Sequence, residues 1–190
     1  MPLSPAREAA YRLRRTHELL QAAVDAVDDA ALYKSGGVTA PSVAFHLWHV
    51  ARYADMLQAR LHVMTDEMGR RLGEEQQIWD TESVADTWGL PSEQLGGAQS
   101  GMGMDEEVSL TMRLPARETL FGYALRAFEA ANRAADAVDD DQLGASGLDL
   151  YGRDSSVAAL LLHHLTHANR HLGMIEALKG VRGLKGTATA

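Results

Sequence analysis

The sequence contains no cysteine among its 190 residues. It therefore cannot form a disulfide framework, a thiolate zinc site or an iron–sulfur cluster, and no protein thiol can act as a nucleophile. A metal ion, if one is bound, must be held by nitrogen and oxygen ligands.

An excess of basic residues is also missing. The 18 lysines and arginines face 26 acidic residues, which gives a formal net charge of −8 and a pI near 5.4. This balance argues against a nucleic-acid partner, because such binding depends on neutralising phosphates.

The sequence lacks long apolar runs. The longest, Val157 to Leu162, is far shorter than the roughly 20 residues that span a bilayer. The N-terminal residues show neither the basic start nor the apolar stretch of a secretory signal. We therefore expect a cytoplasmic protein that acts on a small-molecule substrate, with no membrane partner.

β alternation is nearly absent, and only Val108 to Met112 could form a short extended piece. Helical periodicity instead marks four long segments, at about 4–32, 39–71, 115–139 and 154–180. The first begins at Ser4-Pro5, a hydroxyl cap followed by proline at the first helical position, which is typical of a helix start. The pattern predicts an all-α protein.

The two halves of the chain resemble each other weakly. Residues 26–29 (AVDD) recur at 137–140, and residues 42–44 (SVA) recur at 156–158, each seven residues before a histidine. Because the two repeats are offset by nearly the same number of residues, we predict two similar helical hairpins packed as a four-helix bundle of the up-down-down-up type. Chance similarity between alanine-rich helices is the alternative.

One long interruption, residues 72–114, lies between the second and third helical segments. It holds Trp79, Trp88 and a run rich in glycine and methionine that includes Met102 and Met104. Connections of this length are usually functional or mobile. This loop could form a lid over a ligand pocket, or it could be an ordinary packed excursion. We interpret residues 1–182 as one domain and residues 183–190 as a flexible C-terminal tail.

Seven of the eight histidines lie in the second and fourth segments. At about 100° per residue, one face of the fourth segment carries a stripe that is expected to point into the core: Leu160, His164, His167, His171, Met174 and Leu178. Two histidines four residues apart can close on one metal ion. His167 and His171 have this spacing, and so do His163 and His167.

The second segment supplies further histidines. His49 and Tyr53 are central to its apolar face and His46 lies beside them, whereas Asp55 falls about 120° from His49 and is left out of the ligand set. His17 and His62 have no partner at ligand spacing, so we expect both at the surface.

Facing helices of a bundle commonly build cofactor sites. One histidine from the second segment and two from the fourth would offer three neutral nitrogen donors, which suit zinc, nickel or another first-row divalent ion. The residues alone leave open whether His46, His163, His164 or Tyr53 takes part.

These elements resemble the DinB-like/YfiT-like superfamily of metal-binding four-helix bundles. Residues 47–51 (LWHVA) are similar to the family's histidine element in the second helix. Residues 167–175 (HANRHLGMI) are similar to its paired histidines in the fourth, although Met174 stands where relatives often have glutamine. Residues 88–91 (WGLP) resemble a linking step of some relatives. The resemblance implies a divalent-metal site, zinc or nickel, formed by His49, His167 and His171, and a homodimer.

The resemblance implies fold and metal more than reaction. Some relatives, such as mycothiol-dependent maleylpyruvate isomerase and the bacillithiol or mycothiol S-transferases, use the metal to bind a low-molecular-weight thiol. The first hypothesis is therefore a metal-dependent transferase of an external thiol to a small electrophile.

Two alternatives remain. One is a metal-dependent hydrolase that uses a metal-bound water. It would need a general base, and no aspartate or glutamate lies on the inward faces of the second and fourth segments, although His46 or His164 could serve. The other is a non-enzymatic metal-binding stress-response protein.

Overall fold

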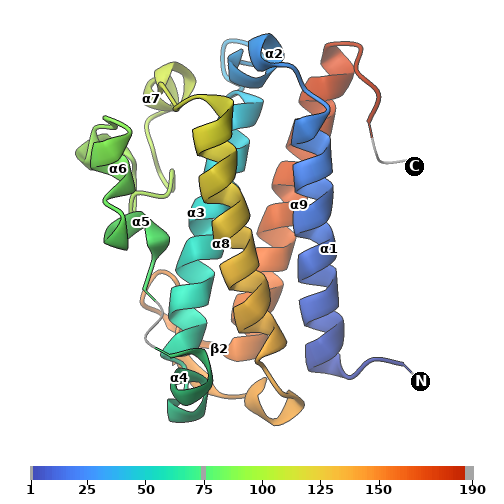
Figure 1. The fold of residues 1–190 in the computed structure, drawn as a ribbon, viewed down its shortest axis with the longest axis vertical. Coiled ribbons are helices and arrows are strands. Elements are labelled where there is room, and N and C mark those ends of the chain that lie inside the picture. Colours follow the sequence, from blue (N-terminus) through green and yellow to red (C-terminus); the bar gives the residue numbers. More distant parts are fainter. Residues whose placement is uncertain (1, 74–75, 187–190) are drawn as a thin grey trace.

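Four long helices form the body of the molecule (Figure 1). They are α1 (Pro5–Asp25), α3 (Val43–His62), α8 (Arg117–Asp136) and α9 (Val157–Val181). The structure, a computed structural model, describes residues 2–73 and 76–186. It confirms the predicted all-α bundle. Part of the predicted tail, residues 187–190, lies outside the described residues.

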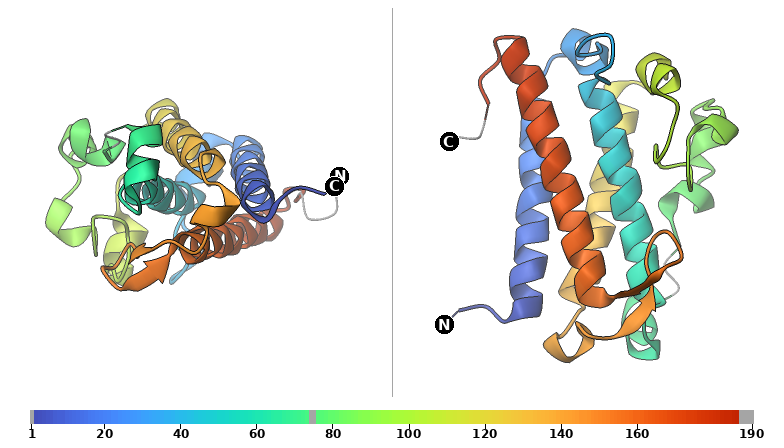
Figure 2. Two further views of the ribbon diagram at one scale, coloured as in Figure 1. Left: turned by 90° about the horizontal axis from the view of Figure 1, so that it is seen from below. Right: turned by 180° about the vertical axis from the view of Figure 1, so that it is seen from behind.

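The four helices run up, down, down and up in chain order (Figure 1). α1 lies diagonally opposite α3 and α8 lies diagonally opposite α9, whereas α3 and α8 are direct neighbours, as the view along the bundle axis shows (Figure 2). Each of α1 and α3 therefore packs mainly against α8 and α9. As a result α3 and α9, which come from different halves of the sequence, lie side by side and antiparallel.

Short elements connect the long helices. They are α2 (Asp29–Tyr33), α4 (Asp66–Leu72), α5 (Ile78–Thr81), α6 (Val84–Thr87), α7 (Glu106–Thr111) and two 3₁₀ turns, η1 (Ser92–Gln94) and η2 (Asp140–Gln142). Strands β1 (Ser146–Leu148) and β2 (Asp154–Ser156) pair antiparallel before α9, with Ser146 opposite Ser156. The sequence pattern missed this hairpin because its strands have only three residues each.

Helix caps explain where the predicted segments break. Asp28 accepts a hydrogen bond from the Ala31 amide and starts α2 afresh, and Thr65 does the same for α4 through the Met68 amide. The expectation of an extended piece at Val108–Met112 is wrong, because the Asp105 carboxylate accepts amide hydrogen bonds and begins α7 there.

The weak internal repeat corresponds to repeated caps. Asp28 and Asp139 occupy the N-cap positions of the short helical turns that follow α1 and α8. Ser42 and Ser156 cap α3 and α9, and each accepts a hydrogen bond from the backbone amide three residues later. The two halves thus share the order of a long helix, a short turn and a serine-capped long helix.

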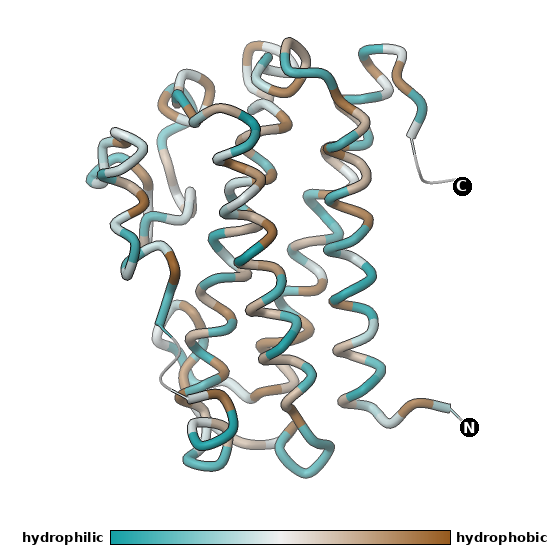
Figure 3. Tube along the Cα trace, in the orientation of Figure 1, coloured by the Kyte–Doolittle hydropathy of each residue, from teal (hydrophilic) through white to brown (hydrophobic). Residues whose placement is uncertain are grey.

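Helix α3 is buried on all sides from Val43 to Gln58. α8 and α9 cover two of its faces, and the connection between α4 and α8 lies along its outer side (Figures 1 and 2). By contrast, hydrophilic and hydrophobic residues alternate along α1, which has an outward face (Figure 3). No helix within the described ranges has the length and apolarity needed to cross a bilayer.

The buried stripe of α9 departs from the prediction at its C-terminal end. Met174 is 41% exposed, whereas Ile175 and Leu178 are buried. The inward stripe steps by four residues after His171, so Met174 falls beside the core rather than in it.

His17 is not at the surface as expected; it is fully buried between α1, α8 and α9. Its Nδ1 lies 2.9 Å from the Asn132 Oδ1 and its Nε2 lies 3.1 Å from the Nε2 of His164. Since Oδ1 only accepts, neutral His17 donates from Nδ1 and accepts from His164 at Nε2. A polar partner on each neighbouring helix makes this burial possible, and sequence spacing could not reveal it. His62, the other histidine expected at the surface, is partly exposed at the end of α3.

We expect His17 to make the fold sensitive to acid. Burial lowers its pKa from 6.5 to about 4. The unfolded chain therefore binds more protons below pH 6.5, and the stability contributed by neutral His17 is complete above that pH and is lost as the pH falls toward 4. Between pH 7 and pH 5, His17 should therefore lower the free energy of unfolding by about 2 kcal/mol.

Urea unfolding of chelator-treated protein at both pH values measures this loss. His17→Gln should show a loss smaller by that amount, whereas His62→Gln should keep the wild-type loss. Equal losses in all three proteins would contradict the assignment.

Candidate metal centre

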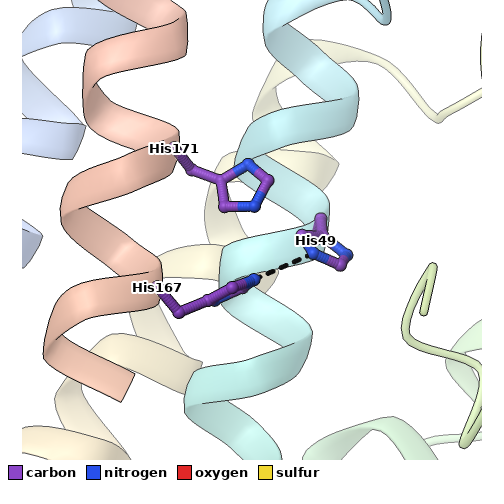
Figure 4. Close-up of side chains that lie close together, drawn as sticks. All are labelled: His49, His167 and His171. Carbon is purple, nitrogen blue, oxygen red and sulfur yellow. Dashed lines mark hydrogen bonds between the residues drawn. The ribbon is translucent and has the colours of Figure 1, made fainter. Parts of the chain in front are cut away.

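Three histidines converge between α3 and α9 (Figure 4). One ring nitrogen each of His49, His167 and His171 lies within 4.8 Å of the other two. The Nε2 atoms of His49 and His167 are 3.0 Å apart. The structure therefore brings together the three residues that the sequence analysis selected.

A backbone carbonyl orients His49. Its Nδ1 donates to the carbonyl oxygen of Ser100 at 2.5 Å, so in the neutral ring the proton is on Nδ1 and the Nε2 lone pair is free. Metal-binding histidines are commonly held in this way through their second nitrogen. Phe45 stacks on the same ring, with the ring centroids 5.9 Å apart.

The other two histidines have different surroundings. The Nδ1 of His171 lies 3.0 Å from the Nδ1 of His46, which leaves the Nε2 of His171 to face the cluster. His167 stacks on Tyr53 with ring centroids 4.0 Å apart, and its Nδ1 has no hydrogen-bond partner within the described chain. His46 thus contacts a cluster member without belonging to the cluster.

Burial keeps the three rings neutral. Burial lowers the pKa of His49 to about 4, and burial together with the neighbouring histidines lowers that of His167 to about 3 and that of His171 to about 2. All three rings therefore carry unprotonated nitrogens at neutral pH, the form that binds metal ions.

The donor set fits a divalent cation. Three imidazole nitrogens on two facing helices match the ligands that first-row metals use in three-histidine sites, and His49 is already in the required tautomer. His167 is only partly buried, so the cluster has a route to solvent on its side. The group can hold a metal ion.

The remaining candidates lie around the cluster. His164 points away to His17. His163 is exposed, and its Nε2 lies 3.5 Å from the hydroxyl of Tyr151 in the loop between β1 and β2. That hydroxyl is 3.0 Å from the hydroxyl of Tyr53, so a chain of polar groups runs from the surface to the ring that stacks on His167.

The 72–114 segment reaches the cluster as an ordered excursion. The side chain of Trp79 is buried and Trp88 packs against it, with ring centroids 5.7 Å apart. The Ser100 carbonyl places the excursion's backbone on His49. At Gly101, with φ of +88°, a Cβ would lie only 2.7 Å from the Nδ1 of His49, so this close approach requires glycine.

A buried ion pair ties the excursion to α3. Arg52 and Asp55, both fully buried, are joined at 3.2 Å. Asp55 accepts the backbone amides of Ile78 and Trp79 at 2.9 Å. Arg52 donates to the backbone carbonyls of Ala98 and Gln99.

The exclusion of Asp55 from the predicted ligand set is consistent with its place in the structure. The sequence did not predict that Asp55 anchors the excursion. The sequence signal for this role was an arginine and an aspartate three residues apart within a largely apolar part of the second segment. That placement indicates a covered face rather than a solvated one.

Asp55→Asn should destabilise the protein by about 3–5 kcal/mol, because it leaves Arg52 buried without its counter-charge. Denaturant unfolding measures the loss, with Asp80→Asn, at an exposed aspartate of α5, as the matched control. A change within about 0.5 kcal/mol, the range of ordinary surface substitutions, would show that the pair does not anchor the excursion.

Comparison with known proteins agrees with the fold. No curated protein matches the chain. A crystal structure of a conserved protein from Enterococcus faecalis superimposes with a TM-score of 0.72 at 15% identity, over 95% of this chain and 98% of the other, which shows a shared fold. The family model of the DinB superfamily matches residues 12–175, which include all three clustered histidines. The chain belongs to the DinB superfamily.

Proposed function

We propose that the protein binds a divalent metal ion, zinc or nickel, through His49, His167 and His171, and transfers a small external thiol to a small electrophile. The observation that carries the proposal is the donor set itself, three neutral imidazoles within 4.8 Å of one another. Neutral imidazoles do not offset the positive charge of the ion. An anion is therefore favoured as its next ligand. When bound, the ion would lower the pKa of a thiol that coordinates it.

The chain's own residues prepare the site for this chemistry. The Ser100 carbonyl fixes the tautomer of His49, and the Phe45 ring shields the same imidazole from water. Tyr53 stacks on His167 and presents its hydroxyl to Tyr151 on the partly open side. The walls are thus aromatic, which suits the apolar part of an electrophile.

One observation favours transfer of a thiol over hydrolysis. The absence of cysteine fits both reactions equally, since it requires only that a thiol nucleophile, if one is used, comes from outside. The described residues that form the candidate group are histidines alone, with no carboxylate to serve as a general base. The buried carboxylate of Asp55 lies away from the ligands and is bonded to the excursion. Hydrolysis remains the alternative.

Metal binding is the first test. Untagged protein should bind about one zinc or nickel ion per chain, measured by elemental analysis and by titration calorimetry. Each of His49→Ala, His167→Ala and His171→Ala should weaken binding by at least about 10-fold, because each change removes a ligand. The matched control His62→Ala, at the far end of α3, should bind as the wild type does. Retained affinity in the three ligand variants would overturn the site.

The second test concerns the reaction. Metal-loaded protein should accelerate conjugation of glutathione, bacillithiol or mycothiol with monochlorobimane, and the His167→Ala/His171→Ala double variant should not. Turnover of esters or amides without a thiol would instead support the hydrolase. Thermal stabilisation by a thiol without turnover would support a binding protein.

A further inference from the structure

A cavity of about 290 Å³ lies against α3 beyond the histidine cluster. Met56, Ala59 and Val63 line it from the helix, and Leu150 lines it from the loop between the two strands. Figure 2 shows this loop beside the C-terminal half of α3. Ala98 of the 72–114 excursion also lines the cavity, so most of the lining residues are apolar, while polar and apolar atoms share its surface about equally.

Two hydrogen-bond donors complete the lining. The guanidinium of Arg60 is the cavity's charged group, and within residues 2–73 and 76–186 it has no ion pair or side-chain hydrogen bond. Gln77 contributes its amide. Arg52 donates to the Gln77 Oε1 at 3.0 Å, which fixes the amide so that its nitrogen remains the free donor.

We propose that this cavity binds a small apolar carboxylic acid, with the carboxylate held by Arg60 and Gln77 and the hydrocarbon part against Met56, Val63 and Leu150. A planar guanidinium matches a carboxylate through two parallel hydrogen bonds, and the amide nitrogen adds a third donor. Apolar side chains beside a few convergent polar groups are the usual residues of a small-molecule site.

The cavity is aligned with the histidine cluster. His49, Tyr53, Met56 and Arg60 are spaced by four, three and four residues, so they lie on one face of α3. Along this face Tyr53 lies between His49 and Met56, and its hydroxyl is bonded to that of Tyr151.

Binding of hexanoate to the full-length chain tests the proposal. The protein is stripped of metal with a chelator, so that the result does not depend on the metal centre. Titration followed by amide chemical shifts should perturb Met56, Arg60, Gln77 and Leu150. Hexanamide, which has the same chain without the charge, should bind at least about 10-fold more weakly.

Arg60→Met keeps the aliphatic stem and removes the charge, and it should weaken hexanoate binding at least 10-fold. Arg133→Met, on the exposed face of α8, is the matched control and should bind as the wild type does. Gln77→Leu, which removes the second donor, should weaken binding independently of any effect of the Arg60 variant on folding.

Three results would overturn the proposal: equal binding of hexanamide, unchanged binding by both the Arg60 and Gln77 variants, or shifts confined to residues outside the cavity. If the metal-loaded protein shows no thiol transfer but the metal-free protein binds hexanoate as described, the proposed function is refuted and the carboxylate site stands.

Discussion

The arrangement of this protein depends on one buried ion pair. Arg52 and Asp55 place opposite charges on a helix that is enclosed on every side, and neither charge could remain there without the other. The pair also needs further hydrogen bonds, which it takes from the backbone of the 72–114 excursion. That demand fixes an otherwise irregular segment against α3 and brings the Ser100 carbonyl to His49.

The core contains two groups of histidines, one enclosed in the protein and one that solvent can reach. His17 and His164 lie deep between helices, and Asn132 fixes the proton of His17, so the first pair is closed to the outside. The cluster of His49, His167 and His171 turns its free nitrogens toward one point, and one of its members is partly exposed. Burial holds both sets neutral, but only the second converges on a point that solvent can reach.

Much of this organisation could be predicted from the sequence. Periodicity and caps predicted the four long helices, and the spacing of histidines on two helices, together with the family resemblance, selected the three that meet. The partners of His17 and the anchoring role of Asp55 could not be predicted, because they depend on which faces of neighbouring helices are covered. Local spacing carries no information on contacts such as the one between His17 and Asn132, which are 115 residues apart.

The packing of α3 against α9, two helices from different halves of the sequence, has a consequence for the unfolded chain. His49 and His167 are separated by 118 positions, so an ion held by both would close a very long loop. Closing such a loop reduces the conformational entropy of the unfolded ensemble if the ligands stay bound, and binding to the folded state alone stabilises it by mass action. In a chain without disulfides, the metal centre would then act as its cross-link.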